Sequence, residues 1–284
     1  MACPPAPALR AVVVEYRAFQ DEAPGSDAQV EPASTRVPLI LDLGAGWLVA
    51  APATGHREQW LRGFGAGMHE TYALVRAAGP ARGVQVDLSP AGARRLFGVP
   101  MHELRNRVVP LPELLGPEAG LLIERLAEAR SSQEQFAVLD RALERPLRGS
   151  AAGSPEVEWA WAELERTAGS VPIGRLRAEL GWSRKRLAAR FREEIGLTPK
   201  AVARVMRFEA LLRRLWLRSV RAPRWAELAL ECGYFDQSHL VREVRALAGR
   251  APHELLAGLR VQPGPPVATV ARETSVQDGR DLAP

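Results

Sequence analysis

The sequence predicts an α+β protein with a β-rich N-terminal domain that ends in helices, followed by an all-α domain. Short apolar or alternating segments, separated by Gly, Pro, Asp and Ser, fill residues 11–95 and are typical of strands and turns. Helical periodicity begins after Leu88. An internal repeat over residues 173–256 indicates two similar helix-turn-helix units joined by a long helix.

Length and composition bound the protein class. The chain has 284 residues, of which 46% are hydrophobic and 25% charged, so we expect about two globular domains and no disorder along the whole length. No apolar run approaches the roughly 18 residues that span a bilayer, and Met1–Leu9 lacks the features of a signal peptide. Two cysteines are too few for a disulfide framework, and we expect a cytoplasmic protein without a membrane partner.

Five segments of the N-terminal domain are expected to be strands. They are Ala11–Phe19, Val37–Leu43, Gly46–Ala50, Thr71–Arg76 and Gly83–Leu88. Their short length and close spacing predict a small antiparallel barrel or sandwich.

Helices are expected to close the N-terminal domain. Apolar periodicity predicts Ala91–Phe97, Glu118–Ala129 and Gln133–Glu144. The small residues of 148–154 predict a linker, which divides the chain into a domain at 1–150 and a domain at 154–260. Ser154-Pro155 begins a further helix that reaches about Ala168, and residues 261–284 lack periodicity and are expected to be a flexible tail.

The repeat pairs the residues of two similar halves. The first half has Ile173, Leu176, Leu180, Gly181, Ser183, Leu187, Phe191, Gly196 and Pro199, and the second has Trp225, Leu228, Cys232, Gly233, Asp236, Leu240, Val244, Gly249 and Pro252. Each half predicts a helix that ends at a glycine and a second helix capped by Ser183 or Asp236. The helix expected over Pro199–Leu217 would be about 27 Å long, which suits two recognition helices about 34 Å apart in successive major grooves of one duplex.

Charge supports a polyanionic partner for the second domain. Residues 170–260 hold 19 Lys and Arg against nine Asp and Glu, whereas residues 1–169 are acidic overall. The helix positions left free by packing predict base contacts from Arg184, Lys185, Ala188, Ala189, Gln237, Ser238, Val241 and Arg242. Phosphate contacts are predicted for Arg186, Arg192, Lys200, Arg204, Arg207 and Arg245.

Residues 173–256 resemble the C-terminal DNA-binding domain of the AraC/XylS family of bacterial transcription regulators. The matching stretches are LGWSRKRLAARFREEIGLTPK and WAELALECGYFDQSHLVREVRALAGRAPHEL. Two departures are Ala189, where the family usually has arginine, and Val244, where an aromatic residue is usual. The resemblance implies sequence-specific binding to operator DNA, with RNA polymerase as a further partner.

Residues 83–116 also look like the N-terminal domain of one AraC-type subgroup. That resemblance implies a β-rich, cupin-like domain that senses a small-molecule effector or forms a homodimer. Trp47, Trp60 and Tyr72 are the candidate aromatic residues of an effector pocket, with core packing as the alternative.

Other site types have weaker support. His56, His69 and His102 do not form the His-x-His pair of a cupin metal site, and Gly63–Gly67 lacks the Lys-Ser/Thr of a phosphate loop. We therefore expect no metal, no cofactor and no catalytic residue, and so no enzyme. Two alternatives stay open: a cupin-like enzyme, or an alkylation or redox sensor using Cys3 or Cys232, each with an accessory DNA-binding domain. A nucleoid-type binder without sequence preference is a third reading.

Overall fold

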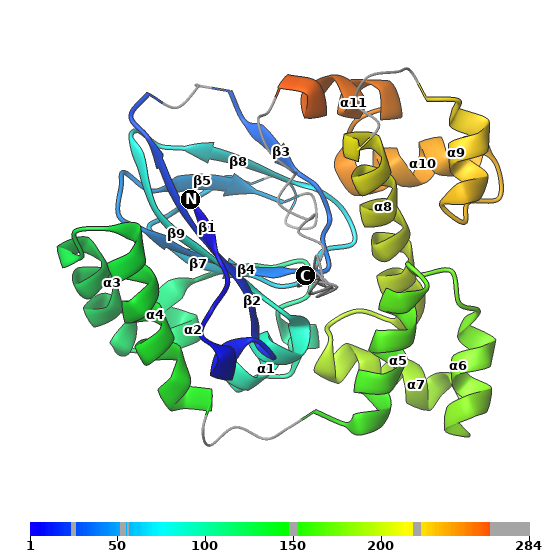
Figure 1. Cartoon of the computed structure of the whole chain (residues 1–284), viewed down its shortest axis with the longest axis horizontal. Helices are drawn as coiled ribbons and strands as arrows, with labels where there is room; N and C mark the ends of the chain where they lie inside the picture. Colours follow the sequence, from blue (N-terminus) through cyan, green and yellow to red (C-terminus); the bar gives the residue numbers. More distant parts are fainter. Residues whose placement is uncertain (24–26, 52–54, 56, 148–152, 218–222, 262–284) are drawn as a thin grey trace, which may run out of the picture.

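The computed structural model describes residues 1–23, 27–51, 55, 57–147, 153–217 and 223–261. The tail expected over 261–284 lies outside this part of the chain except for Val261, and so do residues 148–152 of the expected linker. Figure 1 shows the sheets and their covering helices on one side and the C-terminal helices on the other.

Two antiparallel sheets form the N-terminal part, as the strand pattern predicted. One sheet has the order β1 (Ala2–Cys3), β2 (Val13–Asp21), β9 (Ala81–Leu88), β4 (Val37–Asp42), β7 (Phe64–Ala66) and β10 (Val108–Pro110). The other has the order β3 (Gln29–Glu31), β8 (Ala73–Ala77), β5 (Trp47–Ala50) and β6 (Gln59–Leu61). The five strands missing from the sequence prediction are two or three residues long, too short to show alternation.

The six-stranded sheet is buried on both faces. On one face Tyr16 of β2 stacks on Phe136 of α4 (Ser132–Leu147), with 5.6 Å between ring centroids. On the other face Arg17 and Phe19 line a cavity between the sheets, because successive strand residues point in opposite directions. Register places Val86 of β9 opposite both Tyr16 and Leu39. The sheet therefore separates a helix-covered core from an internal cavity.

Helices and short turns complete this part. Their bounds are η1 (Pro7–Leu9), α1 (Pro90–Phe97), η3 (Met101–Glu103), α2 (Leu111–Leu115), α3 (Glu118–Glu128) and α4. Helix α1 begins one residue before the predicted Ala91, after an N-cap at Ser89 whose hydroxyl accepts a hydrogen bond from Gly92 N at 3.0 Å.

The all-α region has the predicted repeat. It consists of α5 (Pro155–Arg166), α6 (Ile173–Leu180), α7 (Arg184–Glu194), α8 (Pro199–Leu217), α9 (Trp225–Glu231), α10 (Gln237–Ala248) and α11 (Pro252–Val261). Helices α6 and α7 form the first helix-turn-helix unit, and α9 and α10 form the second. Figure 1 shows the two units at opposite ends of α8.

Local caps fix the turns of both units. The Ser183 hydroxyl accepts from Arg186 N at 3.1 Å, and the Asp236 carboxylate accepts from His239 N at 2.6 Å. Gly181 and Gly249, both with φ of +64°, end α6 and α10 in the left-handed conformation that glycine adopts at little cost.

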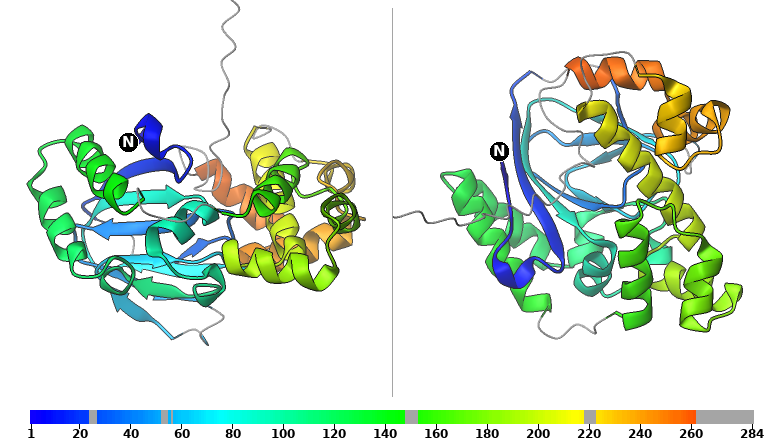
Figure 2. Two further views of the ribbon diagram at one scale, coloured as in Figure 1. Left: turned by 90° about the horizontal axis from the view of Figure 1, so that it is seen from below. Right: turned by 45° about the vertical axis from the view of Figure 1, so that its right-hand side comes forward.

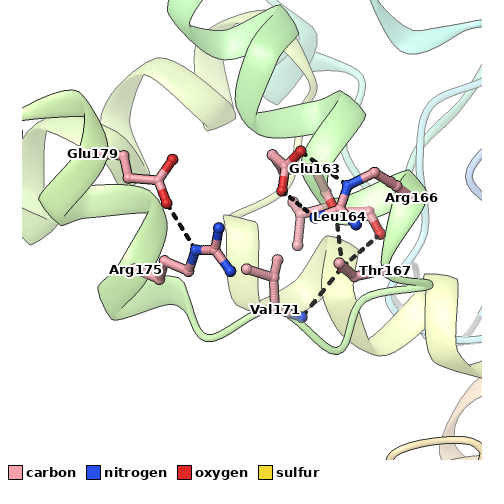
Figure 3. Close-up of polar contacts among 7 residues, drawn as sticks. All are labelled: Glu163, Leu164, Arg166, Thr167, Val171, Arg175 and Glu179. Carbon is pink, nitrogen blue, oxygen red and sulfur yellow. Dashed lines mark hydrogen bonds and ion pairs between the residues drawn. The ribbon is translucent and has the colours of Figure 1, made fainter.

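Figure 3 shows how α5 joins the first unit. The Thr167 hydroxyl donates to the Glu163 carbonyl at 2.7 Å and accepts from Val171 N at 3.2 Å, which ties the end of α5 to the chain entering α6. Arg175 pairs with Glu179 on α6 itself at 2.7 Å.

Buried side chains join the N-terminal part to both units. One apolar cluster runs from Leu9 through the sheet and η3 to Phe191 of the first unit. A second cluster forms the core of the second unit and includes Ala33, which precedes β4. Figure 2 shows the C-terminal helices packed along one side of the sheets. The division into domains at 1–150 and 154–260 remains a prediction. Within the described residues, no helix is both long enough and apolar enough to cross a membrane.

Candidate nucleic-acid interface and effector cavity

The first recognition helix, α7, presents basic residues at its start. Arg184 and Lys185 are exposed, Ala189 is exposed and Ala188 is half-buried. Neither basic side chain forms a hydrogen bond or ion pair with another described residue. Buried Leu187 and Phe191 hold the opposite side of α7 against the core. The basic N-terminal turn is therefore free to contact a ligand.

The second recognition helix, α10, is also divided by burial. Gln237, Ser238 and Arg242 are exposed, while Val241 is half-buried against the core of this unit. The Arg242 side chain has no ion pair with any described residue, and Glu243 instead pairs with Arg204. The structure thus leaves Arg242 available for a contact outside the protein.

Two of the predicted phosphate contacts have partners inside the protein. Arg204 Nε lies 2.6 Å from Glu243 Oε2, which links α8 to α10. Arg207 donates to the Gly169 carbonyl at 2.7 Å, which links α8 to the end of α5. These contacts argue against the phosphate role predicted for both residues and favour a role in positioning the two units.

The other predicted phosphate contacts lie at the surface. Arg192, Lys200 and Arg245 are exposed, and their side chains form no hydrogen bond or ion pair with the described residues. Arg186 is exposed, and its guanidinium lies 4.5 Å from the centroid of the Trp182 ring. That stacking leaves the N–H groups at the guanidinium edge free for a phosphate.

One exposed residue of the second unit was missed by sequence reasoning. Phe235 is 85% exposed in the turn before α10, next to its capping residue Asp236. The sequence carries no signal of this exposure, which only the turn geometry shows. Trp182, in contrast, is buried, and so is Cys232, which belongs to the core of the second unit.

A cavity of about 400 Å³ lies between the two sheets. Its apolar side is formed by residues from both sheets: Phe19, Ile40, Trp47, Val49, Phe64, Val75 and Val108. Phe19 and Trp47 meet edge to face, with ring centroids 5.7 Å apart. A cavity of this size and character suits a small organic ligand.

Charged groups line the other side of the cavity. The Arg17 guanidinium lies 2.8 Å from Glu15 Oε2 and 3.6 Å from Asp87 Oδ2, and Glu31 and Arg36 line the cavity beside them. Burial raises the pKa of Glu31 to about 7, against the opposing effect of Arg17. Burial also raises the pKa of Asp87, although Gln85 donates to it at 2.6 Å. Their signal in the sequence was charge inside strands that are otherwise apolar.

Of the three aromatic residues predicted for an effector pocket, the structure places one in the cavity. Trp47 lines it, and its Nε1 donates to Asp42 Oδ1 at 3.0 Å. Trp60 is 56% exposed on β6, outside the cavity lining. Tyr72 is also outside the lining and lies against Gly249, at the end of α10. Spacing cannot reveal these positions, because aromatic side chains on either face of a short strand look alike in sequence.

The segment that follows β3 connects the cavity with the helix-turn-helix units. Glu31, Ser34 and Arg36 line the cavity. Between them, Thr35 donates to the buried carboxyl of Glu209 on α8 from its backbone N at 2.7 Å and from its hydroxyl at 2.8 Å. The Ser34 hydroxyl donates to Glu209 at 3.1 Å, and Ala33 N donates to the Leu247 carbonyl of α10 at 2.8 Å.

Histidines do not gather at one place. Within the described residues, no group of three or more His, Cys, Asp or Glu side chains is arranged to hold a metal ion. His69 lines the cavity, and its Nδ1 lies 2.6 Å from the Gly67 carbonyl. Burial lowers the pKa of His69, so that its imidazole is neutral near neutral pH.

Two protein-family models match the chain, one in its C-terminal part and one in its N-terminal part. Residues 176–258 match the model of a helix-turn-helix domain, which is of the AraC type. Residues 1–110 match a domain of unknown function, numbered 6597. No curated protein matches the chain.

Solved structures with a similar arrangement come from Vibrio cholerae. ToxT bound to (E)-4-(8-methylnaphthalen-1-yl)but-3-enoic acid aligns with a TM-score of 0.50 and 9% identity, covering 86% of this chain and 99% of ToxT. ToxT of strain O395 aligns with a TM-score of 0.49 and 10% identity over 87% of this chain and 99% of its own. The first alignment shows a shared fold.

Proposed function

We propose that this DNA-binding transcription regulator, with its AraC-type helix-turn-helix domain, reads DNA with both recognition helices and is controlled by a ligand in the N-terminal cavity. The family and the fold point to a transcription regulator rather than to an enzyme. The observation that carries the DNA part is the pair of units on α8, each with exposed polar or basic side chains at the start of its second helix.

The two recognition helices divide the reading of bases unequally. Ala188 and Ala189 of α7 can offer only apolar contacts, such as one to a thymine methyl, so Arg184 and Lys185 provide its polar contacts. On α10, Gln237, Ser238 and Arg242 face outward, and we assign base contacts to them. Exposed Phe235 adds an apolar group at the start of the same helix.

Arg242 provides the test of base reading. Arg242→Ala should relax sequence preference at one or two base pairs, because a bidentate arginine contributes about 1–3 kcal/mol of discrimination. Arg192→Ala is the matched control, since a phosphate contact should weaken all sequences alike and lower the slope of affinity against salt by about one unit. Selection of sites from random duplexes by the wild type and both variants makes the comparison. An unchanged preference in Arg242→Ala would refute its base contact.

A nucleoid-type binder would behave differently in the same selection. The exposed basic residues alone would give salt-dependent binding to any duplex. Enrichment of a common sequence by the wild type supports a specific regulator, whereas recovery of random sequences contradicts it.

Control by the cavity follows from the contacts of residues 31–36. The same short segment lines the cavity and binds α8 and α10 through Glu209 and Leu247. A ligand that moves this segment changes the support of α8, and with it the placement of the two units. Self-association through the N-terminal part is a second means of control.

Thr35→Val tests this connection. The variant removes the hydroxyl that binds Glu209 while keeping the backbone donor. We expect its affinity for the selected DNA site to differ from that of the wild type by a factor of about five to ten, at the low end of a typical allosteric coupling. Thr71→Val, at a threonine that lines the cavity but has no bond to α8, is the control. Equal affinities of the wild type and both variants would contradict control through residues 31–36.

A further inference from the structure

The cavity in the N-terminal part has an apolar side and a charged side. Phe19, Ile40, Trp47 and Phe64 form an apolar wall, while the charged groups gather around Arg17, on β2 two residues before Phe19. A ligand that fills both sides must have a hydrophobic body and one polar head.

We propose that this cavity binds a hydrophobic organic cation, in which an amine or quaternary ammonium head lies against Glu31 and Asp87 and the body packs on Phe19 and Trp47. The inference rests on the proposed function and adds the chemical class of the ligand.

The charge balance at the head side favours a positive ligand. Arg17 and Arg36 line this side together with the carboxyl groups of Glu31 and Asp87, and the Glu15 carboxyl, which is outside the lining, pairs with Arg17. Arg17 is shared between Glu15 and Asp87, at 2.8 Å and 3.6 Å. The Glu31 carboxyl has neither a hydrogen bond nor an ion pair with any described residue. A bound cation neutralises the excess carboxylate, whereas a bound carboxylate adds to it.

The remaining charged and titratable groups around the cavity agree with this balance. Asp21 and Asp27 are exposed members of the cavity lining. Arg76 also lines the cavity, but it lies 3.8 Å from Glu58, which is outside the lining. Neutral His69 adds no charge.

Protonation of Glu31 makes binding sensitive to pH. Burial brings the pKa of Glu31 to about 7, so that its carboxyl carries a proton part of the time near neutrality. A cation at this position favours the ionised form and displaces that proton. The affinity for a cation should therefore rise with pH up to about 7 and level off above it.

The aromatic wall suits a cation as well as its hydrophobic body. Phe19 and Trp47 meet edge to face at 5.7 Å, so they present ring faces and edges to the same space. The face of an aromatic ring attracts an ammonium group, most strongly when water is excluded.

The test uses three small probes of one shape and different charge: naphthylethylammonium, naphthylethanol and naphthylpropanoate. Their binding to the full chain is measured by isothermal titration calorimetry at pH 6, 7 and 8 in buffers of different ionisation enthalpy. Glu31→Gln is the test variant, and Glu22→Gln, an exposed carboxylate outside the cavity lining, is the matched control. Gln is nearly isosteric with Glu, and the circular dichroism spectrum confirms that each variant is folded.

We expect the ammonium probe to bind the wild type about tenfold more tightly than the other two and to release protons on binding at pH 7. In Glu31→Gln, the preference for the cation and the proton release should be lost, while the affinity for the alcohol stays the same. Tighter binding of the propanoate, an equal affinity for all three probes, or no binding of any probe would overturn the proposal. DNA binding by the same preparations is measured in parallel, so a failed ligand assay is distinguished from a failed regulator assignment.

Discussion

Removal of the Thr35 hydroxyl should destabilise the contact between the N-terminal part and α8. In Thr35→Val the side chain keeps its shape, but the buried Glu209 carboxyl loses a hydroxyl donor that lies 2.8 Å from Oε2 and 3.0 Å from Oε1. Thr35 is 6% exposed and Glu209 is 8% exposed, so water cannot readily replace the lost bond. A buried acceptor left without its donor costs about 1–3 kcal/mol.

Two remaining donors limit the loss. Thr35 N and the Ser34 hydroxyl still bind Glu209 at 2.7 Å and 3.1 Å. We therefore expect the free energy of unfolding to fall by about 1–1.5 kcal/mol, the lower part of that range, and the melting temperature to fall by about 2–4 °C for each kcal/mol.

Urea denaturation, followed by circular dichroism and by tryptophan fluorescence, measures the change. Thr71→Val is the matched control, because its hydroxyl has no bond to another described residue, and it should stay within about 0.5 kcal/mol of the wild type. If Thr35→Val is as stable as Thr71→Val, the bonds between Thr35 and Glu209 do not hold the two parts together, and the reasoning is refuted.

Two further predictions concern the same boundary. Burial raises the pKa of the Glu209 carboxyl. The stability that its protonated form gives is therefore present below the ordinary pKa of 4.5 and is lost as pH rises through the raised pKa. Glu209→Gln should flatten this decline, and denaturation midpoints of variant and wild type that fall in parallel with rising pH would contradict the prediction. Gly249→Ala should lower the free energy of unfolding by more than Gly181→Ala. Both glycines have φ of +64°, so each alanine costs about 1–2 kcal/mol in the left-handed conformation, but only at Gly249 would the new Cβ lie 2.7 Å from the Tyr72 ring. Equal losses in thermal melts would show that Tyr72 moves away without cost.

Much of the helical region could be predicted from the sequence, because its determinants are local. The predicted bounds of α8 agree with the structure, and the caps at Ser183 and Asp236 are confirmed. Repeated glycines and apolar residues at fixed spacing specify each helix-turn-helix unit over fewer than thirty residues. The exposed basic start of α7 follows from the same periodicity, since a residue off the packed face of a helix points outward.

Contacts between distant segments decided what the sequence could not. Arg204 has Glu243, 39 residues away, at 2.6 Å from its guanidinium, and Arg207 donates to the Gly169 carbonyl, and no sequence pattern indicated either contact. Tyr72 and Trp60, predicted for the pocket, lie outside the cavity lining. Arg17, Glu31 and Asp87 line the cavity instead, because three strands from separate parts of the chain meet around it. The sequence by itself determined the fold class and the two helix-turn-helix units, since helix periodicity and capping act within a few residues. Tertiary structure alone decided which charges are buried together, because burial and ion pairing depend on neighbours that come together only when the chain folds.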